Sequence, residues 1–278
     1  MPSGTCRGPA SRATIPSVPR TLVTFHAHPD DEAIATGGVM ARAADEGHRV
    51  VALFATGGEL GEVPDGLLRD GETLAQRRLE ETRAAAEILG VRRFEFLGYR
   101  DSGMAGEPTN DAPGAFAVAD VEEAARRVAE ILVEESADVL TVYDDRGGYG
   151  HPDHIQVHRV GIRAAAIAGT PRVYEATMNR DHIRALIRAR ADEMAELEDV
   201  PPEEEFDIGS PASAITTTVD VRAYTTRKRA AMAAHASQIP AESFFLRMPE
   251  DAFREAFGWE WFIRRGERPA EHEDTLFG

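Results

Sequence analysis

The sequence predicts an α/β protein with a Rossmann-like, doubly wound and mostly parallel sheet, followed by a small C-terminal α+β extension. Two observations lead to this fold class. Short runs that are apolar throughout, such as 50–54, are typical of parallel strands covered by helices on both faces. These runs alternate with longer segments of helical periodicity from residue 22 to residue 174, and that alternation predicts right-handed crossovers between parallel strands.

The individual elements follow from local pattern. The predicted strands of the first part are 22–25, 50–54, 94–97, 139–143 and about 172–174, and the predicted helices are 33–46, 72–89, 120–135 and one that begins near His154. The clearest helix is 72–89, because apolar residues recur along one face and Gly90 ends it. Gly37 and Gly38 lie inside the first helix and indicate close packing. The extension is predicted to hold a strand at 215–219, a helix at about 222–236 and a strand at 259–263.

Three regions divide the chain. Residues 1–20 are rich in Pro, Ser and Arg and lack the apolar core of a secretory signal, so we expect a flexible lead-in. Residues 21–200 are expected to form the catalytic domain, and 201–278 an extension packed on the same domain. The acidic stretch 203–205 follows Pro201-Pro202 and marks a linker or an exposed loop.

Composition limits the partners. Lys and Arg number 31 and Asp and Glu 48, so the net charge is 31 − 48 = −17, which repels nucleic acid and anionic lipid. No apolar run approaches the length of about 20 residues that a membrane helix needs. The single cysteine, Cys6, cannot form an intrachain disulfide and suits a cytoplasmic location. We therefore expect a small-molecule substrate and neither nucleic-acid nor membrane partners; the sequence does not predict the oligomeric state.

Two histidine motifs follow two of the predicted strands. His28-Pro29-Asp30-Asp31-Glu32 comes after the first strand, and His151-Pro152-Asp153-His154 comes after the fourth. Strands one and four of a doubly wound sheet are commonly neighbours at the point where the winding reverses, and ligands bind in the crevice there. The two motifs are therefore expected to meet in space.

The chemistry of these residues suits a catalytic metal. Zinc in a hydrolase takes three protein ligands, typically imidazole and carboxylate, and keeps one position open. Two histidines and one carboxylate supply that set, and ferrous iron suits it as well. A surplus carboxylate can act as general base and a surplus histidine as acid. Either motif alone is more simply explained as a helix cap or a turn, whereas the pair favours a metal site.

Other site types have less support. A nucleotide can bind at the same crevice without metal, but no G-x-G-x-x-G follows the first strand and no Walker pattern is present. A Ser-His-Asp hydrolase lacks its G-x-S-x-G turn.

The two motifs resemble those of the PIG-L/LmbE family of zinc-dependent N-deacetylases. The likeness extends from residue 21 to about 240 and includes 58–62, Arg78 with Glu81, 100–104, 147–150 and 234–238. It implies a metal-dependent N-deacetylase or amidase. Carried over by position, it implies roles for nine residues: zinc ligands His28, Asp31 and His154; general base Asp30; acid His151; carbonyl or oxyanion donor Tyr149; sugar-binding Arg78 and Asp101; and Glu62 lining the same pocket.

Five of the residues in or near these motifs also have structural interpretations. Arg78 and Glu81 stand three residues apart and could simply pair on a helix surface. Asp101 could cap its own loop. His235 lies in a helical pattern, where a structural histidine is at least as plausible as a functional one, and His26 is expected to face away from the site.

Within the family, the likeness is greatest to enzymes of the mycothiol pathway. The resemblance therefore implies removal of an N-acetyl group from an N-acetylglucosamine-type glycoside such as N-acetylglucosaminyl-inositol. The segment 244–263 is more similar to the amidase that cleaves mycothiol S-conjugates, or to the wider family. Two alternatives thus stay open: that amidase activity, and a non-catalytic sugar- or nucleotide-binding module with a structural metal.

Overall fold

The computed structural model describes residues 18–189 and 206–278. Most of the predicted lead-in, the predicted boundary at residue 200 and the acidic stretch 203–205 lie outside the described residues.

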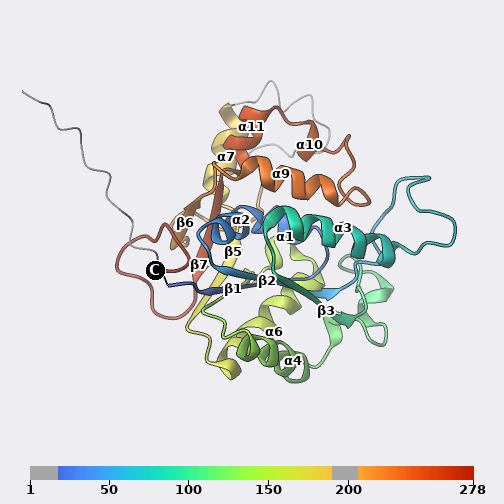
Figure 1. Cartoon of the computed structure of the whole chain (residues 1–278), viewed down its shortest axis with the longest axis horizontal. Helices are drawn as coiled ribbons and strands as arrows, with labels where there is room; N and C mark the ends of the chain where they lie inside the picture. The colour runs from blue at the N-terminus through green and yellow to red at the C-terminus, as the bar shows by residue number, and fades with distance from the viewer. Residues whose placement is uncertain (1–17, 190–205) are drawn as a thin grey trace, which may run out of the picture.

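The described strands form one seven-stranded sheet, in the order β3-β2-β1-β4-β5-β7-β6 (Figure 1). The first five strands are parallel to one another. Their bounds are β1 Thr21–His26, β2 Arg49–Thr56, β3 Arg93–Tyr99, β4 Val139–Tyr143 and β5 Arg172–Thr177. β7 (Trp259–Arg264) runs antiparallel to both β5 and β6 (Thr217–Asp220). The predicted α/β class with a mostly parallel sheet is confirmed.

Helices cover both faces of the sheet, which is why the strands are apolar on both sides. One face carries α2 (Gly37–Asp45), α3 (Leu74–Leu89) and α9 (Thr225–Ala234), and the other carries α4 (Val121–Glu134) and α6 (Pro152–Ala168) (Figure 1). Successive residues of β1 point to opposite faces: Leu22 belongs to the first core and Val23 to the second. The alternation follows from the two-residue period of a strand.

Local signals define the helices that support the site. Thr73 and Gln76 form a capping box at the start of α3, and Gly90 ends that helix in the left-handed conformation. α6 begins at Pro152, a favoured first position, with His151 as its N-cap. Gly161 lets α6 approach β4 closely, because a Cβ there would lie 2.3 Å from Cγ1 of Val142.

The prediction of one helix over 33–46 is wrong. The structure has two helices, α1 (Asp31–Ala35) and α2, separated at Thr36. The amides of Gly38 and Val39 donate to the carboxylate of Glu260 on β7, at 2.7 and 2.8 Å, so they do not continue the hydrogen bonds of α1. A residue far along the chain therefore determines where the second helix begins.

Residues 206–278, the described part of the predicted C-terminal extension, join the main sheet through β6 and β7 and also contribute helices. Besides α9 it contains α10 (Phe244–Arg247) and α11 (Glu250–Phe257), and α7 (Arg180–Ala189) follows β5; these three helices were not predicted. Lys228 on α9 and Glu260 form a buried ion pair with Nζ and Oε1 2.5 Å apart. The pair links α9, β7 and the start of α2.

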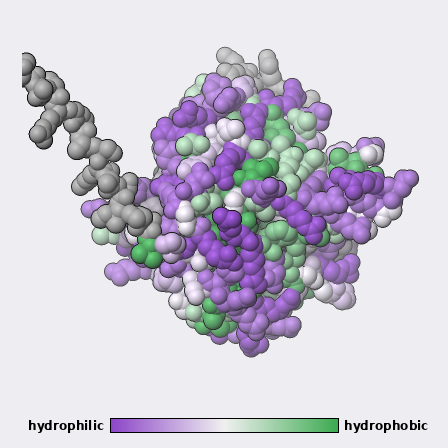
Figure 2. All heavy atoms as spheres, viewed as in Figure 1, coloured by the Kyte–Doolittle hydropathy of each residue, from purple (hydrophilic) through white to green (hydrophobic). Residues whose placement is uncertain are grey.

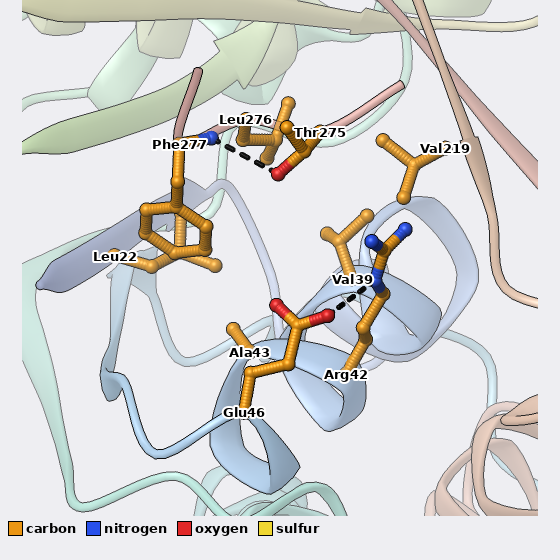
Figure 3. Close-up of a pocket in the computed structure, with 9 residues that line it drawn as sticks. All are labelled: Leu22, Val39, Arg42, Ala43, Glu46, Val219, Thr275, Leu276 and Phe277. Atoms are coloured by element: carbon orange, nitrogen blue, oxygen red, sulfur yellow. Dashed lines mark hydrogen bonds and ion pairs between the residues drawn. The ribbon is translucent and has the colours of Figure 1, made fainter. Parts of the chain in front are cut away.

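The last residues of the chain pack at the amino end of β1. Leu276 is buried, and with Thr275 and Phe277 it closes a small pocket against α2, where Arg42 and Glu46 pair at 2.8 Å (Figure 3). This pocket lies at the edge of the sheet opposite the histidine motifs, which follow the carboxyl ends of their strands.

The face of the molecule seen in Figure 2 is largely polar. Figure 2 shows hydrophilic residues over most of one face, with hydrophobic residues in smaller groups between them. Among the described residues, no helix is both long enough and apolar enough to cross a membrane.

The close contact at Gly161 generates a stability prediction. We expect Gly161→Ala to lower the melting temperature by several degrees, since overpacking costs about 1–3 kcal/mol and each kcal/mol shifts Tm by about 2–4 °C in a protein of this size. Thermal denaturation followed by circular dichroism measures the change.

The matched control is the same substitution in a Val142→Ala background. There the clashing Cγ1 atom is absent, and the higher helix propensity of Ala should make Gly161→Ala neutral or stabilising. An equal loss of Tm in both backgrounds would contradict the close-contact explanation.

Candidate active site

Parallel pairing of β1 with β4 brings the two histidine motifs together. Leu22, Val23 and Thr24 pair with Val139, Leu140 and Thr141, so both strands end at the same edge of the sheet. The loop after β1 carries residues 28–32, and the segment after β4 leads through α5 (Gly147–Gly150) into the start of α6. The predicted neighbouring of strands one and four is confirmed.

The three predicted metal ligands lie side by side. Oδ2 of Asp31 is 3.5 Å from Nδ1 of His28 and 3.4 Å from Nε2 of His154. Two atoms bound tetrahedrally to zinc at about 2.0–2.1 Å would be about 3.3–3.5 Å apart. The spacing therefore matches that of ligands around one metal ion.

A buried atom without a partner supports the same interpretation. Nε2 of His154 is buried and has no hydrogen-bond partner among residues 18–189 and 206–278. Buried polar atoms are normally paired. An imidazole nitrogen that points toward a carboxylate is the kind of ligand atom that zinc binds. Potential ligand atoms of His28, His151 and His154 also lie within 4.8 Å of one another. The described residues thus fit a metal ion at this place.

Polar residues behind His28 orient its ring. Nε2 of His28 lies 3.1 Å from Oδ2 of Asp153 and 3.5 Å from Oδ1 of Asp101. Asp153 is fully buried and also accepts hydrogen bonds from the amide and hydroxyl of Ser102. A carboxylate behind a histidine fixes the tautomer and leaves the other nitrogen free for a metal. Nδ1 of His28, which lies 3.5 Å from Oδ2 of Asp31, is then the nitrogen left free for a metal.

Asp30 occupies a strained backbone conformation beside this cluster. Its φ angle is 105°, outside the usual range of a residue with a side chain, at a cost of about 1–3 kcal/mol. Its amide donates to Oε2 of Glu32 at 2.9 Å, and its Oδ1 lies 3.3 Å from the guanidinium of Arg78. Burial raises the pKa of Asp30 to about 6, against the effect of Arg78. A carboxylate in this range is suited to exchanging protons near neutral pH.

The rings of His151 and Tyr149 lie next to the rings of His28 and His154. The ring of His151 lies 4.7 Å from that of His28, and the ring of Tyr149 lies 5.1 Å from that of His154. Burial and then the imidazoles of His28 and His154 lower the pKa of His151 to about 4, so this residue is neutral at pH 7. Tyr149 is about half exposed.

The predicted substrate residues occupy different settings. Arg78 is buried, does not pair with Glu81, and donates to the carbonyls of Gly58 and Pro29 as well as contacting Asp30. Asp101 caps its loop through the amide of Gly103 and also reaches His28. Glu62 is exposed, and its backbone carbonyl accepts from Gln238 at 3.0 Å. Binding of sugar hydroxyls by Arg78, Asp101 and Glu62 stays a prediction.

Several supporting contacts were not predicted. Tyr143 stacks on His154 with ring centroids 4.1 Å apart. The carboxylate of Glu81 accepts from the amide and hydroxyl of Ser237. Asp153 carried one signal in the sequence, because it repeats in the second motif the His-Pro-Asp of the first. The other contacts depend on the tertiary structure. His26, by contrast, lies in the core between Thr36 and Tyr143.

Comparison with curated proteins identifies relatives over nearly the whole chain. A protein of Geodermatophilus obscurus named 1D-myo-inositol 2-acetamido-2-deoxy-alpha-D-glucopyranoside deacetylase is 40% identical, over 93% of this chain and 97% of its own length. A protein of Nocardiopsis dassonvillei with the same name is 42% identical, over 91% of this chain and 98% of its own length.

Comparison with solved structures supports the fold. The N,N'-diacetylchitobiose deacetylase of Pyrococcus horikoshii superposes with a TM-score of 0.58 at 22% identity, over 88% of this chain and 83% of that one.

The model of the PIG-L family, described as GlcNAc-PI de-N-acetylase, matches residues 23–165, which include both histidine motifs. This chain is therefore a hydrolase that belongs to the PIG-L family of de-N-acetylases.

Proposed function

We propose that this protein removes the N-acetyl group from N-acetylglucosaminyl-inositol, using zinc held by His28, Asp31 and His154. The observation that carries the proposal is the buried Nε2 of His154, which has no hydrogen-bond partner among the described residues and lies 3.4 Å from Oδ2 of Asp31. The names of relatives about 40% identical over most of the chain support the choice of substrate.

The metal and the general base have separate tasks. Zinc bound at this site supplies Lewis acidity toward the amide carbonyl and lowers the pKa of water toward about 7. Asp30 accepts the proton of the attacking water, and its pKa of about 6 allows it to release that proton again. The guanidinium of Arg78, 3.3 Å from Oδ1 of Asp30, keeps the Asp30 carboxylate in place.

His151 and Tyr149 act on the amide itself. The oxygen of water bonds to the carbonyl carbon, the carbon–nitrogen bond breaks, and the water proton ends on the departing amine. His151 begins neutral, so it must first gain a proton before it can act as acid. Negative charge that develops on the carbonyl oxygen raises the proton affinity of His151. His151 then takes the proton held by Asp30 and gives it to the nitrogen of the departing amine. The Tyr149 hydroxyl donates to that oxygen.

The substrate is held by residues at the edge of the site. We assign sugar hydroxyls to Arg78 and Asp101, with Glu62 on the neighbouring loop. The buried charge of Asp101 suits this role, because hydrogen bonds from His28, Gly103 and Leu60 outweigh burial and keep its pKa well below its usual value. We also assign the catalytic residues to a domain spanning 21–200, with 201–278 packed on it.

The decisive experiment is metal content measured together with deacetylation. We expect about one equivalent of zinc in the wild-type protein and loss of both zinc and free-amine release in His154→Ala, since that substitution removes a ligand. His158→Ala, one turn later on α6, is the matched control and should keep both. Wild-type protein that resists zinc reconstitution would contradict the proposal.

The role of Asp30 gives a separate prediction. Asp30→Asn keeps the shape of the side chain but cannot accept the proton, so turnover should fall by about 100-fold or more while zinc remains bound. Mass spectrometry of the metal and steady-state kinetics measure the two effects. Loss of zinc in this variant would place Asp30 among the ligands instead.

Two exposed apolar residues favour testing a larger substrate. Leu60, whose amide donates to Asp101, and Met104 are both about half exposed on loops beside the site. We expect N-acetylglucosaminyl-inositol to give a higher kcat/KM than a bimane S-conjugate of mycothiol when both are assayed by free-amine release. The reverse order would identify the protein as the S-conjugate amidase.

A further inference from the structure

We infer that His235 and Glu32 form a positioning pair that holds Asp30 in its working conformation. The inference rests on the proposed function, in which Asp30 is the general base. His235 comes from the segment after α9, in the C-terminal extension, and Glu32 is the last residue of the first histidine motif.

The contacts form a continuous chain of hydrogen bonds from His235 to Asp30. Nε2 of His235 lies 2.6 Å from Oε1 of Glu32, and Oε2 of Glu32 accepts from the amide of Asp30 at 2.9 Å. Both members of the pair are buried, with exposures of 0% for His235 and 2% for Glu32. An ionised carboxylate only accepts hydrogen bonds, so Nε2 of His235 is the donor.

The backbone of Asp30 requires such support. A residue with a side chain does not remain at a φ of 105° without surrounding contacts that hold it there. Arg78 contacts the carboxylate of Asp30, and Glu32 accepts a hydrogen bond from its amide. Both the side chain and the backbone of Asp30 are therefore held by neighbouring residues. Without His235, the buried Glu32 carboxylate loses the partner that fixes its second oxygen toward that amide.

His235 is itself held in place by its neighbours. The amide and hydroxyl of Ser237 donate to Glu81 on α3, and Gln238 donates to the carbonyl of Glu62. Nδ1 of His235 has no hydrogen-bond partner in the described part of the chain. The imidazole of His235 therefore bonds to Glu32 through Nε2 alone, which fits a positioning role. It does not touch the reacting atoms.

Kinetics of paired variants test whether His235 acts through Asp30. His235→Ala should lower kcat by about tenfold to a hundredfold, the scale of a small misplacement of a catalytic group, with KM little changed and zinc content retained. His235→Gln keeps a donor near Nε2 and should restore most of kcat. In an Asp30→Ala background, His235→Ala should cause no further loss.

A thermal-stability cycle tests the same inference without any substrate. Glycine tolerates a positive φ and alanine does not, so Asp30→Gly should melt higher than Asp30→Ala. This difference should shrink when Glu32→Ala or His235→Ala lets the backbone of residue 30 relax. The unfolded-state entropy of glycine contributes equally in both backgrounds and cancels.

The matched control is His48→Ala. His48 is a buried histidine at the opposite edge of the sheet, bonded to the amide of Arg20. We expect this variant to lower Tm, leave kcat unchanged and leave the glycine–alanine difference at residue 30 unchanged.

The outcomes separate the inference from the proposed function. One outcome is that the wild-type protein hydrolyses no N-acetyl sugar, while the Tm difference between Asp30→Gly and Asp30→Ala still shrinks in the Glu32→Ala or His235→Ala background. That outcome would overturn the proposed function and uphold the positioning pair. An active enzyme in which the losses of His235→Ala and Asp30→Ala multiply, with an unchanged glycine–alanine difference, would overturn the pair.

Discussion

The parallel pairing of β1 with β4 is the constraint on which the site depends. It places the ends of two strands next to each other, and each strand delivers one histidine motif to the same edge of the sheet. The pairing is possible because the apolar faces of both strands are covered by helices. Substituting residues in either motif changes the chemistry, whereas separating the strands would remove the site altogether.

Around this junction, buried charge is organised in pairs that join distant segments. Lys228 and Glu260 connect the C-terminal extension to the start of α2, and His235 and Glu32 connect it to the loop after β1. Unpaired buried charges would be costly. Each pair therefore favours a single relative placement of the segments that it joins, which is the precision that a hydrolytic site requires.

Much of the fold was predictable because its signals are local. The apolar strands and the capped helix α3 could be located from neighbouring residues, and the two histidine motifs could be paired by the topology of a doubly wound sheet. The break at Thr36 could not be predicted, because it depends on Glu260 from the far end of the chain. For the same reason Asp153 and His235 gained their roles only when their partners were known.

The position of His235 has a consequence for the order of folding. The loop after β1 leaves the ribosome long before residue 235, because synthesis proceeds from the N-terminus. The loop can meet the second histidine motif at the start of α6 once β4 has paired, but the inferred support for the Asp30 amide arrives only with residue 235. During synthesis the two histidine motifs can therefore come together before the inferred support for the Asp30 amide is in place.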